Sequence, residues 1–208
     1  FADAGLLINV GGNGEQSAKE LIFNVEVTQK VPVWLRLVAV DTPGHGSMPN
    51  ATSSVTRIVD ALSILRANPF PARIVPAVDT MFQSLSLSAS PEWEEAYSNL
   101  AGAVREPGFL EKLQQHSAFL HARTRDTCSL TRFEASNKIN VVPPEAWAEI
   151  DCRILPDRPS EVFVAELQEM ISETGVKVEV IMAFTPAVSD TNTLLYRAIE
   201  NVTAERYP

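Results

Sequence analysis

The stretch DTPGHGSMP, at residues 41–49, joins two segments that each have a regular hydrophobic pattern. The preceding run, VWLRLVAV at residues 33–40, is strand-like because apolar and β-branched residues dominate it. From about residue 51 to residue 67, apolar side chains recur at steps of three and four residues, which predicts an amphipathic helix. The stretch at 41–49 is therefore expected to be a strand-to-helix corner.

A single histidine, His45, stands in this corner between Gly44 and Gly46. Glycine adopts positive φ without steric cost, so we expect the backbone around His45 to turn sharply or to approach another surface closely. Pro49 fits the preference of proline for the first turn of a helix. Binding and catalytic groups often sit on such corners, which makes His45 a candidate functional residue. A plain Gly-Pro turn that contains a histidine is the alternative.

The later part of the chain adds three strands and a second helix. Residues 146–155 and 176–184 alternate between apolar and polar, and residues 127–135 also have strand character. Between the last two strands lies a helical stripe, made of Phe163, Val164, Leu167, Met170 and Ile171. From residue 33 the order is strand, helix, strand, strand, helix, strand. This order predicts an α+β fold, a ferredoxin-like four-stranded antiparallel sheet with two helices on one face.

A helical insertion at about 70–125 follows the first helix, with short helices expected at 78–87, 93–104 and 109–122. It contains His116 and His121. Five residues apart on one helix, the two side chains point about 140° away from each other, so they do not share a metal ion. We expect both to be exposed to solvent.

Arg153 lies in the strand at 146–155, on the face opposite the apolar residues, where a ligand can reach it. An ion pair with Asp151 or Glu149 at the surface is the alternative. The two cysteines, Cys128 and Cys152, are too few for a disulfide framework and lack metal-ligand spacing. We expect them to lie near each other as buried free thiols.

The composition is that of a globular protein without nucleic-acid affinity. The chain has 208 residues, of which 17 are basic and 26 acidic, and the formal net charge of −9 argues against phosphate binding. Apolar runs stay well below the ~20 residues that span a bilayer, so we expect no membrane segment. The chain has no initiator Met and opens within a sequence pattern, and it stops just after a helical run. We therefore expect it to be part of a longer protein.

Three short motifs, in order, resemble one enzyme family: GHGSMP at 44–49, NKINVVPP at 137–144 and IDCRILP at 150–156. The family is metallopeptidase family 20, which contains the aminoacylases, carboxypeptidase S and the succinyl-diaminopimelate desuccinylases, and the likeness is greatest to the carboxypeptidase-S-like branch. The resemblance implies that residues 31–186 are a lid and dimerisation domain. Residues 1–30 would be the edge of a zinc-binding catalytic domain, and residues 187–208 the start of the return to it.

The resemblance also implies roles for four residues. His45 would stabilise the oxyanion formed during amide hydrolysis, in the active site of the partner subunit. Arg153 would bind the substrate carboxylate, for which its planar fork of donors is suited. Asn140 would contact the substrate, although a loop-capping side chain is the alternative. Asp3 would be a zinc ligand, although an aspartate before a glycine is also a common turn residue.

The implied activity is that of a zinc-dependent peptidase or amidohydrolase, a homodimer paired through the lid. It would cleave N-acyl amino acids or small peptides with a free carboxylate, using two zinc ions per subunit. A zinc site needs several converging ligands, and the chain has only three histidines. We therefore expect this chain alone to bind no zinc and to hydrolyse nothing. Without the resemblance, a non-catalytic α+β dimerisation or ligand-binding module is the alternative.

Overall fold

The chain forms two compact units in a computed structural model that describes residues 13–16 and 21–207. The first, here called the sheet unit, comprises Lys30–Val75 and Gly108–Pro186. The remaining described residues form the second unit. The helical insertion at 70–125 is divided between the two.

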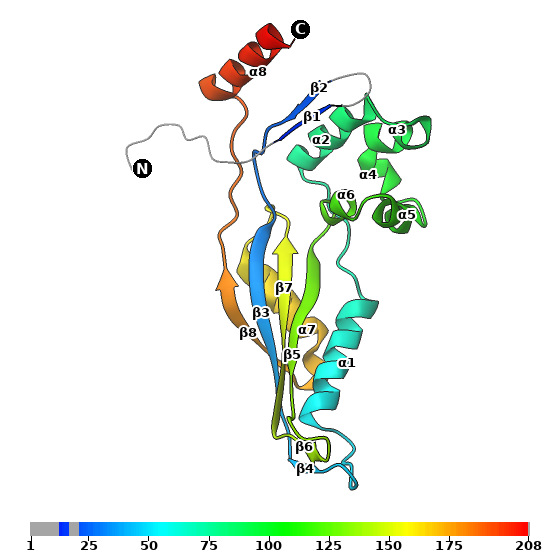
Figure 1. Cartoon of the computed structure of the whole chain (residues 1–208), viewed down its shortest axis with the longest axis vertical. Helices are drawn as coiled ribbons and strands as arrows, with labels where there is room; N and C mark the ends of the chain where they lie inside the picture. Colours follow the sequence, from blue (N-terminus) through cyan, green and yellow to red (C-terminus); the bar gives the residue numbers. More distant parts are fainter. Residues whose placement is uncertain (1–12, 17–20, 208) are drawn as a thin grey trace, which may run out of the picture. The chain divides into compact units, whose positions relative to one another are not determined.

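The sheet unit contains four antiparallel strands in the order β5-β7-β3-β8 (Figure 1). Their bounds are Val31–Val40 for β3, Thr127–Glu134 for β5, Glu145–Ile154 for β7 and Lys177–Ala183 for β8. The first of these four strands along the chain, β3, thus lies between the third, β7, and the fourth, β8. The predicted α+β fold with an antiparallel sheet is confirmed.

Two helices, α1 (Ser54–Ala67) and α7 (Ser160–Met170), cover one face of this sheet. Alternate residues of the central strands point towards them, because successive side chains of a strand face opposite sides. Burying a large apolar side chain contributes about 1.5–3 kcal/mol, so this layer accounts for much of the stability of the unit. Its fully buried members include Val33, Leu35, Leu37, Ile58, Ile154, Phe163 and Leu167.

Helix α1 begins later than the sequence predicted. Its N-cap is Ser53, whose hydroxyl accepts from the backbone N–H of Thr56, while the Thr56 hydroxyl accepts from the backbone N–H of Ser53. This reciprocal capping box satisfies two donors at the helix terminus. The placement of Pro49 in the first turn was therefore wrong, because the side-chain cap and not the proline sets the start.

Two of the helices predicted in the insertion, at 93–104 and 109–122, are each divided into two shorter helices. The sheet unit holds α5 (Phe109–His116) and α6 (Ala118–Ala122), separated at Ser117, whose side chain caps α6 by accepting from the backbone N–H of Leu120. The two histidines are thus not on one helix. His116 is exposed, as predicted, but His121 is only 9% exposed, and the expectation that it faces solvent was wrong.

In the second unit, α2 (Pro76–Ser86), α3 (Pro91–Ser98) and α4 (Leu100–Ala103) pack around Phe82, whose ring meets that of Tyr97 edge-on. This unit also contains the antiparallel pair β1 (Asn13–Gln16) and β2 (Leu21–Asn24), and helix α8 (Leu194–Arg206). None of the helices in the described part of the chain combines the length and the hydrophobicity needed to cross a bilayer.

Cys128 and Cys152 form a disulfide, so the expectation of free thiols was wrong. The two residues stand directly opposite each other on β5 and β7, with their Cα atoms 4.0 Å apart. The register of β5 against β7 decides this pairing, and spacing in the sequence does not reveal that register. The bond closes a loop across 24 residues, which stabilises the folded state by roughly 3 kcal/mol.

Candidate functional site

The corner that carries His45 is held against a second loop by backbone hydrogen bonds. His45 and Gly44 form the short strand β4 (Gly44–His45), which pairs with β6 (Val141–Val142). The backbone N–H of Gly46 donates to the carbonyl of Asn140 over 2.8 Å. The chain turns sharply at residues 45–48, where the N–H of Met48 donates to the carbonyl of His45 over 2.9 Å, and it approaches Asn140 closely, so both expectations are confirmed, although neither glycine has positive φ.

The ring of His45 is oriented by its neighbours. Nδ1 lies 3.2 Å from the backbone N of Ser47 and 2.9 Å from its hydroxyl. Because the backbone N–H can only donate, Nδ1 is the acceptor and Nε2 carries the ring proton in this arrangement. Nε2 lies 3.4 Å from Nδ2 of Asn140; both nitrogens are donors in this arrangement, so the two side chains are neighbours that both point donors at the same place. The structure thus brings His45 and Asn140 together and presents an N–H donor beside an amide, with both side chains exposed to solvent.

Asp41, at the end of β3, fixes the base of this corner. Its carboxylate accepts from the backbone N–H of Thr42, the hydroxyl of Thr52 and the guanidinium of Arg57 on α1. The hydrogen bond from Arg57 is the main reason that the pKa of Asp41 is lowered. The corner is thereby attached to the first helix. Sequence patterning did not identify Ser47 or Asp41, because their contacts depend on how the loop closes.

Arg153 lies elsewhere on the sheet, near the far end of β7. Its Nε and Nη2 donate to the two oxygens of Asp151 over 2.8 and 3.0 Å, which is the ion pair that the sequence left open as an alternative. The other alternative partner, Glu149, accepts instead from Arg36 and Arg132. The side chain of Arg153 is nevertheless 44% exposed, so it remains accessible to a ligand.

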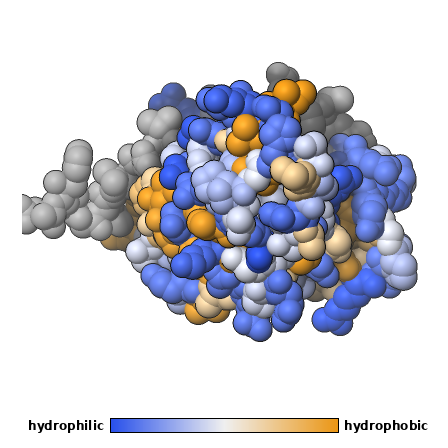
Figure 2. Space-filling model, turned by 90° about the horizontal axis from the view of Figure 1, so that it is seen from below, coloured by the Kyte–Doolittle hydropathy of each residue, from blue (hydrophilic) through white to orange (hydrophobic). Residues whose placement is uncertain are grey.

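His45 and Arg153 lie at opposite ends of the sheet unit (Figure 1). The β4–β6 pair adjoins the end of the sheet at which β7 begins, and β7 spans about 27 Å between Glu145 and Arg153 at about 3.4 Å per residue. Figure 2 looks onto the β4–β6 end, where hydrophobic and hydrophilic residues are interspersed. No single substrate of amino-acid size contacts both side chains of one chain.

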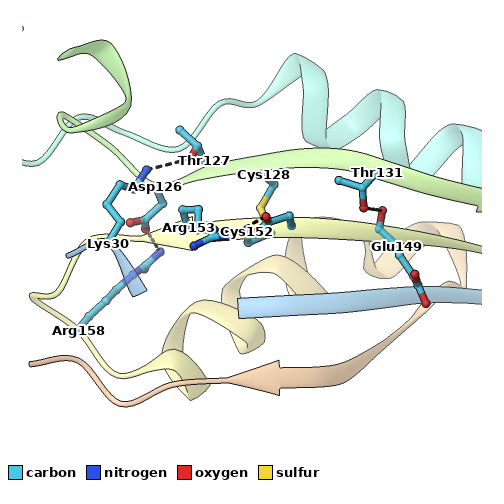
Figure 3. The surroundings of a disulfide bond; sticks show 10 residues. Lys30, Asp126, Thr127, Cys128, Thr131, Glu149, Cys152, Arg153 and Arg158 are labelled. Carbon is cyan, nitrogen blue, oxygen red and sulfur yellow. Dashed lines mark hydrogen bonds and ion pairs between the residues drawn. A yellow bond between two sulfur atoms is a disulfide. The ribbon is translucent and has the colours of Figure 1, made fainter. Parts of the chain in front are cut away.

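A buried carboxylate stabilises the end of the sheet near Arg153. Asp126 accepts from both Nη atoms of Arg73, from Arg158 over 2.5 Å and from the backbone N–H of Leu155 over 2.7 Å, and its side chain is fully buried. Figure 3 shows Asp126 and Arg158 close to the disulfide. A sequence gives no direct sign of such a cluster, because its members come from three separate segments.

Two predictions concern metal binding, and both stay predictions. Asp3 lies outside the described residues, so its role as a zinc ligand stays a prediction. In the parts of the chain that the structure describes, no three His, Cys, Asp or Glu side chains gather closely enough to hold a metal ion. The donors of the described residues therefore do not by themselves fit a zinc centre.

Residues 27–179 match the peptidase dimerisation domain. The chain therefore belongs to the M20 peptidase family, as the three sequence motifs predicted. It is 28% identical to the probable carboxypeptidase S-like 2 of Dictyostelium discoideum over 90% of its own length and 36% of that protein. It is also 30% identical to the N-fatty-acyl-amino acid synthase/hydrolase PM20D1 of Xenopus tropicalis, over 82% and 33% of the two chains. The chain thus spans about a third of these relatives.

Solved structures share the fold. The M20 metallo-carboxypeptidase Sso-CP2 of Sulfolobus solfataricus superposes with a TM-score of 0.52 at 18% identity, over 86% of this chain and 50% of that one. Human carnosine dipeptidase 1 also gives a TM-score of 0.52, at 10% identity over 89% and 45%. These likenesses show a shared fold, while the match of residues 27–179 shows that the chain contains a peptidase dimerisation domain.

Proposed function

We propose that the chain is the lid and dimerisation part of a zinc-dependent amidohydrolase or peptidase. Its substrate would be an N-acyl amino acid, or a small peptide, with a free carboxylate. The similarity to a probable carboxypeptidase S-like protein and to an N-fatty-acyl-amino acid synthase/hydrolase supports this substrate class. Zinc, two ions per subunit, would be held by a catalytic domain of which residues 1–30 and 187–208 are the fringe, and would supply an activated water.

His45 would act in the active site of a second subunit. The observation that carries this part of the proposal is the separation of His45 and Asn140 from Arg153 along β7. If all three serve one reaction, the first two must come from one copy of the chain and the arginine from another.

An antiparallel homodimer would satisfy this requirement. The strands at the edges of the sheet, β5 and β8, present backbone donors and acceptors that a second copy can pair with. A twofold axis through such an edge pairing runs the two strands in opposite directions. The β4–β6 end of one subunit then lies beside the Arg153 end of its partner.

The chemistry would be divided between the two subunits. The Nε2–H of His45 would donate to the oxyanion of the tetrahedral intermediate, with Asn140 as a second polar contact, while Arg153 would hold the carboxylate of the substrate. Ser47 would keep Nδ1 unprotonated and thus keep Nε2–H as a donor.

The proposal is tested by replacing His45 with alanine in the full-length protein. Loss of one oxyanion donor lowers kcat by about 10²–10³, so we expect that loss with little change in zinc content or in the circular dichroism spectrum. His116→Ala, a matched change on the exposed side of α5, should leave kcat unchanged. Equal kcat values for the His45→Ala variant and the wild type would exclude a catalytic role for His45.

A further inference from the structure

Lys30, which immediately precedes β3, has an unusual environment for a lysine. Its ammonium group donates to the carbonyl oxygen of Ala122 and to the hydroxyl of Thr127, each over 2.8 Å, and the side chain is partly buried. Figure 3 shows the contact with Thr127. Both acceptors are uncharged, so neither hydrogen bond neutralises the positive charge. Transferring a charge from water without such compensation is costly.

The surroundings of Lys30 are rich in positive charge. Burial is the main cause that lowers the pKa of Lys30 to about 8, and Arg123, Arg153 and Arg73 lower it further. Asp126 opposes them, but its carboxylate is already hydrogen-bonded to Arg73 and Arg158. A bound anion would therefore compensate a charge that the protein itself leaves only partly balanced.

Thr127 accepts a hydrogen bond from Lys30 and also lies next to Arg153 on the neighbouring strand. The two residues Thr127 and Arg153 are directly opposite each other on β5 and β7, and directly opposite residues point to the same face of a sheet. This is the face opposite α1 and α7. A hydroxyl can accept from Lys30 and at the same time donate to another group. Lys30, Thr127 and Arg153 thus offer three donors to one anion on this face.

Arg153 alone is poorly equipped to attract a carboxylate. Two of its N–H groups already bind Asp151, and that carboxylate balances its charge. An arriving carboxylate would meet a nearly neutral ion pair, with further N–H groups available but little net attraction. Lys30 supplies the missing positive charge.

We infer that Lys30 is a second carboxylate-binding residue, and that an anionic group of the substrate binds beside Thr127, between Lys30 and Arg153. This inference rests on the proposed function, since it concerns the same substrate carboxylate. It differs from a purely structural role, in which Lys30 would only tie the end of α6 to β5.

The first test compares substrates with and without a carboxylate. In the full-length protein, Lys30→Met should raise KM for N-acetyl-L-leucine about tenfold, the effect of one charge-assisted hydrogen bond. KM for an N-acetyl-leucyl amide should not change. Lys30→Arg, which keeps the charge, should retain most of the affinity for the carboxylate. Lys177→Met, an exposed lysine on the opposite edge strand β8, is the matched control and should have no effect. An equal KM increase for both substrates, or none for either, would overturn the inference.

The pH dependence gives a second prediction with a defined sign. Only the charged form of Lys30 attracts an anion, so affinity for the carboxylate should fall as the pH rises through about 8. Arg73, Arg123 and Arg153 stay charged over this range. His121, another neighbour, has its pKa lowered by burial and is therefore uncharged above pH 7. The Lys30→Arg variant should lose the pH dependence.

Binding to this chain alone separates the inference from the proposed function. With isotope-labelled lysines, NMR titration of the 208-residue chain should show that N-acetyl-L-leucine raises the pKa of Lys30, whereas its amide does not. If the pKa rises but the full-length protein hydrolyses no N-acyl amino acid, the anion site stands and the proposed substrate class fails. If hydrolysis and a need for Arg153 are found but the pKa of Lys30 does not respond, the inference about Lys30 fails alone.

Discussion

Arg153 combines a bidentate ion pair with a substantial exposed surface. The ion pair is typical of a structural role, whereas the exposure is typical of a ligand-binding role. The pair with Asp151 orients the guanidinium, while the 44% exposure leaves donors for a ligand. An exposed pair of this kind adds little to stability, with a median of about 0–1 kcal/mol. A large effect of replacing Arg153 would therefore come from function.

For Arg153→Ala in the full-length protein we expect kcat/KM to fall by about one to two decades, since a charged hydrogen bond contributes roughly 1.5–3 kcal/mol. The loss should be smaller for substrates whose carboxylate is amidated. Steady-state kinetics with both kinds of substrate measure this difference. Equal losses on the two would assign Arg153 a structural role.

Asp126 has the opposite character, because it is fully buried and hydrogen-bonded on both oxygens. In Asp126→Ala, Arg73 and Arg158 would keep Asp157 and Glu166 as ion-pair partners. The buried backbone N–H of Leu155 would lose its acceptor, which costs about 1–3 kcal/mol. Asp126→Ala should lower the free energy of unfolding by that amount in urea titrations of the chain. Asp60→Ala, on the exposed side of α1, should change it by less than about 0.5 kcal/mol. Similar results for both would mean that the Asp126 cluster is not stabilising.

At the scale of elements, periodicity predicted what depends on neighbours along the chain. The alternation at 146–155 and the stripe from Phe163 to Ile171 became β7 and α7, because one face of each must be buried. Helix ends were less predictable, since Ser53 and Ser117 act through side-chain caps that depend on local loop geometry.

The candidate site was only partly predictable for a related reason. Motif order predicted roles for His45, Asn140 and Arg153, which stay predictions, and the β4–β6 pair brings the first two together. The ion pairs of Asp41 and Asp126 and the contacts of Lys30 join segments that are far apart in the sequence. A pattern of residue types does not contain that information, because it depends on the register of the sheet.

Asp41 should control the order of the corner around His45. Hydrogen bonding lowers its pKa in the folded state, so the stabilisation is present above the unfolded pKa of about 3.9 and is lost as the pH falls through the folded value. Asp41→Asn should imitate this loss at pH 7 by removing the charge that binds Arg57.

We expect hydrogen exchange at the amides of Thr42 and Gly46 to become about two- to fivefold faster in Asp41→Asn, in line with an exposed ion pair. Asp60→Asn removes one negative charge from the exposed side of α1, away from the corner, and should leave exchange at both amides unchanged. Unchanged exchange in the Asp41→Asn variant would show that the pairing of β4 with β6 is sufficient to hold the corner.

For the whole molecule, the essential geometry is the placement of His45 with Asn140 at one end of the sheet and Arg153 at the other. A twofold dimer would turn this separation into proximity between subunits, and a monomeric site would not. Substitutions at the two ends should therefore complement each other when they are on different subunits, whereas substitutions at the same end should not.

The test uses heterodimers of the full-length protein in which one subunit carries His45→Ala and the other Arg153→Ala, isolated by two different affinity tags. If His45 acts across the interface, one site of each heterodimer has both residues and the other has neither, so about half of the wild-type activity should return. If both residues act within one subunit, each site lacks one of them. The activity should then remain at only a few per cent of the wild-type value, because Arg153→Ala is expected to cost about one to two decades. The matched control pairs His45→Ala with Asn140→Ala, which lie 3.4 Å apart at the same end. In that heterodimer each site lacks either His45 or Asn140, whether the residues act within one subunit or across the interface. Recovery to half of the wild-type activity in the first heterodimer, without recovery in the control, would assign His45 to the partner's active site.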